Sequence, residues 1–428
     1  MEPSVTSYSS HSLRAQPQEP LQSKTISAKG TFVVLLATLA ASTLLLSFIF
    51  FSILVGHSRW SVYLLQVCQG IALLEKSWWH FRIRQRFLAP LEAAVAVVFG
   101  GGDLERPRTD RAQYERELLE RMEPKNYAIA RFTDRWMKGV RGAQVTVALV
   151  AASAAAAVST VVAIYVESTV VTSAAVGTFV AVASACFAPT PSDGVAIFIH
   201  EGTLTVTAMS TMIAHYTGSE TQIAILDYLF VALGGWTMIV ISRVVMTKKV
   251  LECFLMVTLD TIAMVHVTVI LVEVVDFVEH PLASNLPREF AAFFVTVASA
   301  ELGHFLFDVV TTQQQRVRCF RRWRASRAAD FITSVLFGAA GMLAWMLWIV
   351  TTSMNTWNIV TLVGAAALSQ LGRSFMTLIH ETALAPPWNR TTFTVWNNGI
   401  MELMNPFLVG WIVFHPYAKS ILESAGGY

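Results

Sequence analysis

The stretch from Pro287 to Arg327 reads PREFAAFFVTVASAELGHFLFDVVTTQQQRVRCFRRWRASR. It is apolar from Phe290 to Val310, which is about the 20 residues that a helix needs to cross the hydrocarbon core of a bilayer. Glu301, His304 and Asp308 interrupt this run at helical spacing, so they fall on one helix face. That face must turn away from lipid, because a charge in hydrocarbon is costly. The stretch therefore predicts a membrane-spanning helix with one polar face.

A cluster of arginines follows the apolar run. Cytoplasmic loops of membrane proteins are enriched in Lys and Arg, so the cluster predicts the cytoplasmic end of this helix. Arginines next to a bilayer also attract anionic headgroups. We therefore expect a contact with anionic lipid through Arg316, Arg318, Arg321, Arg322 and Arg324.

The composition indicates that the bilayer is the solvent of this chain. Of its 428 residues, 54% are hydrophobic and only 14% are charged, against roughly 25% charged residues in soluble domains. The mean hydropathy is +0.53. The formal net charge of +2 and the absence of any nucleotide loop or nucleic-acid module argue against a nucleic-acid partner. We predict an integral multi-pass membrane protein, and the sequence indicates neither which membrane holds it nor its oligomeric state.

The fold class is predicted to be an all-α polytopic transmembrane helix bundle with about 11 spans. Applying the 20-residue rule along the chain places these spans at Thr31–Val55, Val62–Trp79, Gly142–Val166, Ser168–Ala188, Val195–Tyr216, Gln222–Val245, Val250–Phe277, Phe290–Thr312, Ala329–Val350, Trp357–Ile379 and Phe393–Phe414. With eleven spans, all four cationic regions of the chain fall on one side of the membrane, which predicts a cytoplasmic N-terminus.

The chain divides into five parts on this interpretation. Residues 1–30 are predicted to be a disordered cytoplasmic tail, 102–141 cytoplasmic amphipathic helices, 142–415 the main bundle and 416–428 a short C-terminal tail. The part 31–101 holds two spans and the apolar segment Phe87–Gly100, which is short for a span and contains Pro90 and Glu92. This segment is either re-entrant or interfacial, or it extends the preceding helix.

Ionisable residues within the predicted spans are the candidate functional residues. On the predicted topology they gather toward the cytoplasmic half of the bundle, where they would line a polar cavity for transport if their helices are neighbours. His with carboxylates suits either a divalent transition metal or a proton relay. The structural alternative is that they pair with arginines of the inner loops. The candidates are His200, Glu201, Asp260, Glu301, His304, Asp308, Arg373, His380 and Glu381.

A second group of ionisable residues falls toward the outer ends of the predicted spans. His266 and Glu273 share a helix face, with Asp276 close by, and Asp227 begins the preceding apolar run. These residues either line an extracellular vestibule or are interfacial carboxylates that reach water.

No catalytic or cofactor signature occurs in the chain: it has no Gly-x-Ser-x-Gly, His-Glu-x-x-His, Walker loop or Cys-x-x-Cys. We therefore expect no cofactor and identify no catalytic residue. The leading hypothesis is a carrier or channel for an ion or small polar solute. The alternatives are a non-transporting membrane protein, such as a receptor-like, viral or organellar scaffold, and an intramembrane enzyme in which Glu301, His304 and Asp308 surround a metal.

Overall fold

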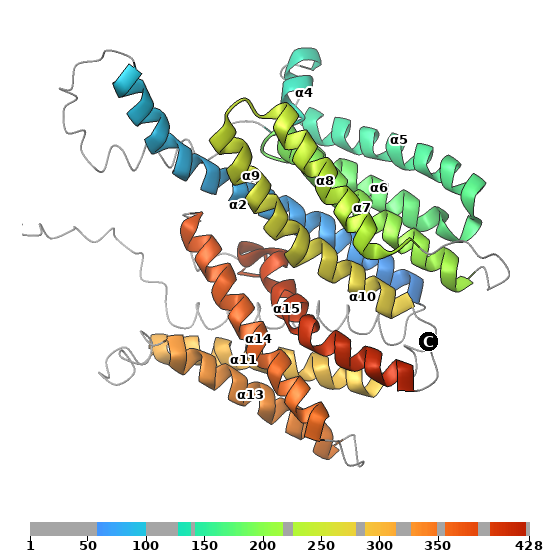
Figure 1. The fold of residues 1–428 in the computed structure, drawn as a ribbon, viewed down its shortest axis with the longest axis vertical. Coiled ribbons are helices and arrows are strands. Elements are labelled where there is room, and N and C mark those ends of the chain that lie inside the picture. The colour runs from blue at the N-terminus through green and yellow to red at the C-terminus, as the bar shows by residue number, and fades with distance from the viewer. Residues whose placement is uncertain are drawn as a thin grey trace, which may run out of the picture.

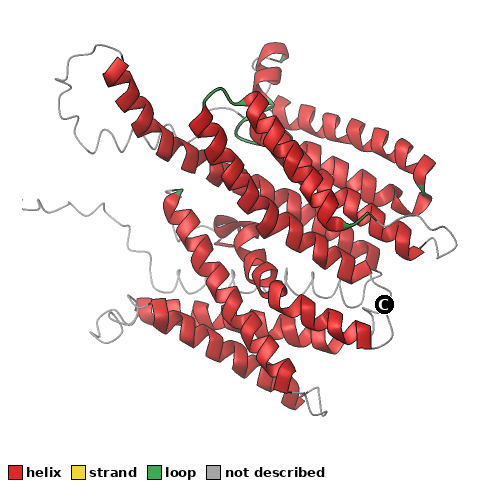
Figure 2. Ribbon diagram, in the orientation of Figure 1, coloured by secondary structure: helices red, strands yellow, loops and turns green. Residues whose placement is uncertain are grey.

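The computed structural model describes residues 58–99, 127–137, 142–216, 226–279, 287–313, 327–348, 356–383 and 394–424. Nearly all of these residues are helical and none of them forms a strand (Figure 2). The helices are α2 (Ser58–Phe99), α4 (Ala130–Trp136), α5 (Ala143–Val166), α6 (Val171–Cys186), α7 (Pro191–Tyr216), α8 (Tyr228–Met246), α9 (Val250–Ala263), α10 (Ile270–Glu279), α11 (Pro287–Gln313), α13 (Arg327–Trp348), α14 (Thr356–Thr382) and α15 (Thr394–Ser424). A 3₁₀ turn, Ser168–Val170, leads into α6, and a π-helical segment, Met264–Val269, joins α9 to α10.

Seven helical segments are long and apolar enough to cross a membrane, which indicates a multi-pass membrane protein. They are Ala143–Val166, Ser168–Cys186, Tyr228–Met246, Val250–Val278, Arg288–Phe307, Ala328–Leu347 and Thr356–Ile379. The helices α2, α7 and α15 are also long but carry more polar residues. The predicted span Thr31–Val55 lies outside the described residues. The count of eleven spans and the cytoplasmic N-terminus therefore stay predictions.

The structure describes the segment 87–99 and a portion of the predicted amphipathic part 102–141. The segment 87–99 continues the preceding helix, because α2 runs without interruption from Ser58 to Phe99. Of the predicted amphipathic part 102–141, the structure describes 127–137, where the short helix α4 lies. The Arg316–Arg324 cluster lies outside the described residues.

The described helices form two groups that follow one another along the chain (Figure 1). In the first group α5, α6, α7, α8 and α9–α10 pack in sequence, and α2 crosses them in contact with α6, α7 and α9. In the second group α11 packs along α13, and α14 packs along α15. The contacts between the groups are made chiefly by α2 and α10 against α15.

Aromatic side chains fill the interface between the two helix groups. Phe277 of α10, Phe290 and Phe293 of α11, and Trp411 and Phe414 of α15 form one cluster, with Phe293 and Phe414 stacked at 4.5 Å between ring centroids. All five side chains are buried. Aromatic pairs of this kind stabilise a core beyond the effect of their buried area, so the interface is well packed where α10, α11 and α15 meet.

The outer helices expose apolar side chains instead of polar ones. Val150 and Tyr165 of α5, and Phe230 and Val245 of α8, are all more than half exposed. In a soluble protein a continuous apolar surface of this extent would favour aggregation, whereas lipid tails solvate it. The first group is thus polar on the inside and apolar on the outside, and its interior holds the candidate site.

Candidate functional site

The start of α7 positions one carboxylate of the candidate site. In Thr190-Pro-Ser-Asp193, the hydroxyl oxygen of Thr190 accepts a hydrogen bond from the backbone N–H of Asp193 at 3.2 Å and donates one to Asp193 Oδ2 at 2.6 Å. The first of these bonds is one half of a capping box, and a proline occupies the first helical position. The cap holds the Asp193 side chain at the helix N-terminus, where it is buried.

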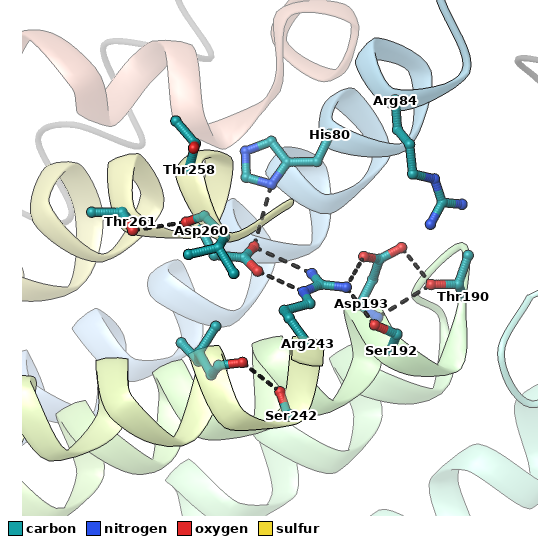
Figure 3. Close-up of polar contacts among 12 residues, drawn as sticks. His80, Arg84, Thr190, Ser192, Asp193, Ser242, Arg243, Thr258, Asp260 and Thr261 are labelled. Atoms are coloured by element: carbon teal, nitrogen blue, oxygen red, sulfur yellow. Dashed lines mark hydrogen bonds and ion pairs between the residues drawn. The ribbon is translucent and has the colours of Figure 1, made fainter. Parts of the chain in front are cut away.

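Arg243 of α8 joins Asp193 to a second buried carboxylate, Asp260 of α9 (Figure 3). Its Nε donates to Asp260 Oδ2 at 2.7 Å, and Nη2 donates to Asp260 Oδ1 at 3.3 Å. Its Nη1 donates to Ser192 Oγ at 2.5 Å and lies 2.9 Å from Asp193 Oδ1. The guanidinium, which is 1% exposed, therefore pairs with carboxylates from two other helices, one of them in the bidentate geometry that Arg favours.

Helix α2 adds two further groups to this network. His80 Nδ1 lies 3.6 Å from Asp260 Oδ1. One turn earlier, the fully buried Lys76 places Nζ 3.3 Å from His266 Nδ1, and His266 Nε2 lies 2.7 Å from Asn405 Oδ1. With Lys76 as an ammonium, which only donates, His266 Nδ1 accepts and Nε2 donates to Asn405. A chain of polar contacts thus runs from α2 through the π-helical segment to α15.

The π-helical segment Met264–Val269 carries two of the contact residues of the site. His266 faces Lys76 and Asn405, while Thr268 Oγ1 lies 2.9 Å from His200 Nδ1 of α7. A single π turn shifts the side chains after it relative to an α-helix, and such turns occur often at functional sites. Here the segment lets one helix contact α2, α7 and α15.

A cavity of about 20 Å³, counted as space for the centre of a water molecule, lies inside the network. A water needs roughly 10–15 Å³ by this measure and two to four polar partners. The cavity is therefore large enough for a water or a small ion, and too small in this conformation for a larger solute. Its polar lining is contributed by Lys76, Ser77, His80, Asp193, His200, Arg243 and Asp260.

The candidate residues predicted from sequence lie in both helix groups and do not line one common cavity. His200 and Asp260 line the cavity, and Glu201 is buried beside it on another face of α7. Glu301 of α11 instead accepts a hydrogen bond from Gln370 at 2.8 Å and forms an ion pair with Arg373, both on α14.

His304, predicted to share the face of Glu301, contacts a different helix. Its Nδ1 lies 2.8 Å from Asp330 Oδ1 of α13. The side chains of Asp308, His380 and Glu381 lie outside the described part of the structure. The roles of all these residues in transport stay predictions.

Several network residues were not among the candidates. Arg243 and Lys76 belong to two of the four cationic regions that the sequence predicts to be cytoplasmic, because cations at helix ends usually reach water there, and His266 belongs to the predicted outer group. A signal for α2 does exist in the sequence: Gln66, Gln69, Lys76 and His80 recur at three-, four- and seven-residue spacing, which puts them on one face. A polar stripe on an apolar helix predicts a buried polar interface.

Comparison of the chain with models of protein families, with curated proteins and with solved structures found no match.

Among the described residues, no group of three or more His, Cys, Asp or Glu side chains is arranged to hold a metal ion. The described histidines of the network contact a lysine, an amide, a hydroxyl and a carboxylate instead. The arrangement can hold charge and hydrogen bonds inside an apolar bundle, and two cations, Lys76 and Arg243, there face two carboxylates, Asp193 and Asp260.

Proposed function

We propose that the protein is a multi-pass carrier or channel for an ion or a small polar solute, and that the network around Arg243 and Asp260 is its polar centre. The observation that carries this proposal is a buried set of charged groups from α2, α7, α8 and α9 around a cavity of about 20 Å³. Ionisable residues inside membrane bundles are rare and usually belong to ion pathways or proton relays.

Energetics support a functional reason for the network. Taking charges out of water costs several kcal/mol per ion, and well-packed apolar residues in place of a buried ion pair are often neutral or stabilising. A bundle that needed only stability would therefore not require Arg243, Asp193 and Asp260 at its centre. A network of paired charges also has a second arrangement available, because a passing ion can replace one partner of a pair.

The location of the network supports a role in a conformational change. The chain Lys76–His266–Asn405 links the first helix group to α15 of the second. Nearby, the carboxylate of Glu75 accepts hydrogen bonds from the backbone N–H groups of Ile400 and Met401 at 2.9 Å each. In carriers, one set of helices moves against another around a central site, and these polar contacts lie where such a movement would take place.

The test is reconstitution of the purified chain in liposomes with a panel of proton, Na⁺, K⁺, chloride and phosphate fluxes. We expect one of these fluxes above that of empty liposomes, and its loss in Asp260→Asn and Arg243→Gln. Leu306→Ala is the control, because Leu306 lies on α11, outside the network, and is 36% exposed. A folded wild type with no flux in a panel widened to small polar solutes would exclude the carrier.

A non-transporting multi-pass scaffold is the second candidate, and the second helix group favours it. There Glu301 pairs with Arg373 and His304 with Asp330, so these groups satisfy one another. The flux panel decides between the two candidates, and the triple variant Glu301→Gln, His304→Leu, Asp308→Asn tests whether this face of the second group takes part in transport. Residues that only satisfy one another predict a stable protein with unchanged flux, whereas a transport role of this face predicts a loss of flux that exceeds any loss of expression.

A further inference from the structure

Glu201 is the most unusual buried group of the described structure. Its side chain is 0% exposed, and neither carboxylate oxygen has a hydrogen-bond partner among the described residues. It lies in the first helix group, where α7 packs against α2 and α6. An isolated carboxylate in an apolar interior costs far more than a paired one. Glu201 therefore requires a positive charge that the described side chains do not supply.

Two glutamine side chains of α2 lie in the same interface. Gln66 Nε2 donates to Ser173 O of α6 at 3.2 Å and to Thr205 Oγ1 of α7 at 3.3 Å, and Gln69 Nε2 donates to His200 O at 3.0 Å. Thr205 is one helical turn beyond Glu201, and His200 precedes it directly. Both amides therefore contact α7 at the level of Glu201.

The contacts of these amides also assign their oxygens. Backbone carbonyls only accept hydrogen bonds, so the atoms facing Ser173 O and His200 O must be the amide nitrogens. The remaining atoms, Gln66 Oε1 and Gln69 Oε1, are buried and have no hydrogen-bond partner among the described residues. Together with Glu201, the interface thus holds four buried oxygens that lack a donor.

The interface is tight where these groups meet. Gly177 of α6 faces Thr205 and Gln66 so closely that a Cβ atom at this position would lie 2.0 Å from Thr205 Oγ1. Helices approach closely in membranes where such small residues lie between them. A species that enters this interface must therefore be small, and one that compensates the carboxylate of Glu201 must be positively charged.

We propose that the α2/α6/α7 interface binds a small monovalent cation, a proton or Na⁺, through Glu201 with the amide oxygens of Gln66 and Gln69. Carboxylate and carbonyl oxygens suit a hard cation, whereas the interface offers no thiolate set for a soft metal. The site is distinct from the Arg243–Asp260 network, where arginine already neutralises the carboxylates. The bound cation is also the coupling ion of the proposed carrier. Its role in coupling rests on the proposed function, whereas its binding does not.

The titratable groups around Glu201 are few. Cys68 of α2 lies within electrostatic range of it, and His200 is its neighbour on α7, with Nδ1 on Thr268 and Nε2 unpartnered among the described residues. Helix α6 carries no charged residue and contributes only Cys186, at its end. No lysine or arginine of these three helices is recorded beside Glu201 in the described structure, so the added cation carries the compensating charge.

The experiment uses the full chain purified in detergent and the substitution Glu201→Gln, which keeps the shape and removes the charge. Glu301→Gln is the matched control, since it changes a membrane-helix glutamate whose carboxylate already has Arg373. Thermal unfolding and binding of radioactive Na⁺ are measured in NaCl and in choline chloride at equal ionic strength. Infrared difference spectra between the wild type and each variant at neutral pH report the carbonyl stretch of a protonated carboxyl group.

Either cation gives a distinct result. If Na⁺ binds, it raises the Tm and binds saturably in the wild type and in Glu301→Gln, and both effects are lost in Glu201→Gln. If a proton binds, Na⁺ has no effect and the spectrum contains a protonated carboxyl band that only Glu201→Gln removes. A wild type with neither saturable Na⁺ binding nor that band overturns the proposal.

A measurement on the wild type covers the case in which Glu201→Gln does not fold. Carbodiimides modify protonated carboxyl groups in apolar surroundings, and peptide mapping would locate the modification. Modification at Glu201 supports the proton, protection by Na⁺ supports Na⁺, and an unmodified Glu201 without Na⁺ binding overturns the site. These binding results do not depend on flux, so a failure of the carrier proposal leaves them unaffected.

Discussion

At the scale of single residues, the stability lost when a charged group is removed depends on how its partner is paired and how deeply it is buried. Arg243 and Asp260 are each 3% exposed or less and contact each other through two hydrogen bonds. His304 and Asp330 form a pair of the same kind with side chains that are 26% and 30% exposed. Removing one partner leaves a buried charge without compensation in the first case, whereas the second pair is only partly buried and a smaller loss is expected.

We therefore expect Arg243→Met to destabilise the protein by about 3–5 kcal/mol, because Asp193 and Asp260 lose their countercharge. The triple variant Arg243→Met, Asp193→Leu, Asp260→Leu should recover most of this loss. Asp330→Asn is the control and should change the free energy of unfolding by less than about 1 kcal/mol. Equilibrium unfolding in detergent measures all three, and a neutral Arg243→Met would contradict the described network.

Asn405 gives a second prediction at this scale. Its Oδ1 accepts the hydrogen bond from His266 Nε2, and both side chains are buried. Asn405→Leu leaves the ring N–H without an acceptor, which should cost about 1–3 kcal/mol. Asn405→Asp keeps an acceptor and should retain more of the stability. The comparison is made by thermal unfolding, and equal stability of the two variants would show that the contact is unimportant.

At the scale of elements, the π-helical segment sets the direction in which His266 and Thr268 point. Deleting Val265, which is 59% exposed, would convert the segment toward an α-helix and rotate the residues before it by about 100° relative to those after it. We expect a marked loss of thermal stability and of any flux, because the contacts of α9 with Arg243 and those of α10 could no longer form together. Val265→Ala keeps the register and should remain close to wild type.

Helix formation and apolar surface were predictable from sequence because they follow from local composition. The seven apolar segments coincide with predicted spans. The site was only partly predictable. Asp260 and His200 were found because they interrupt apolar runs, but Arg243 and Lys76 resemble interfacial cations in sequence. Only the packing of α2 against α7 and α9, and of α8 against α7 and α9, makes them interior residues, and that packing is not local.

At the scale of the whole molecule, the orientation in the membrane is the main open prediction. The eleven-span topology puts the segments near Glu279 and near Arg321 on opposite sides of the bilayer. Single cysteines introduced at these two places, in a chain whose four native cysteines are replaced, should react with a membrane-impermeant reagent from opposite sides. Labelling of both from the same side would exclude this topology.

The arginine cluster after α11 provides a test with lipids. Replacing Arg316, Arg318, Arg321, Arg322 and Arg324 by Gln should weaken retention of anionic lipid by the purified protein, at about 1 kcal/mol for each arginine near the surface. Mass spectrometry of co-purified lipid measures this retention. Replacement of Arg131 and Arg135, which both belong to the short helix α4, is the comparison. Unchanged anionic lipid in the first variant would contradict the predicted contact.

The length of α2 has a consequence of its own. Its 42 residues correspond to about 63 Å at 1.5 Å per residue, roughly twice the thickness of the hydrocarbon core. At a tilt of about 40°, the upper end of the usual range for membrane helices, a helix of this length is still longer than the hydrocarbon core is thick, and Figure 1 shows one end of it extending beyond its neighbours. In electron cryo-microscopy, a helix that extends beyond the detergent micelle would serve as a landmark for aligning particle images.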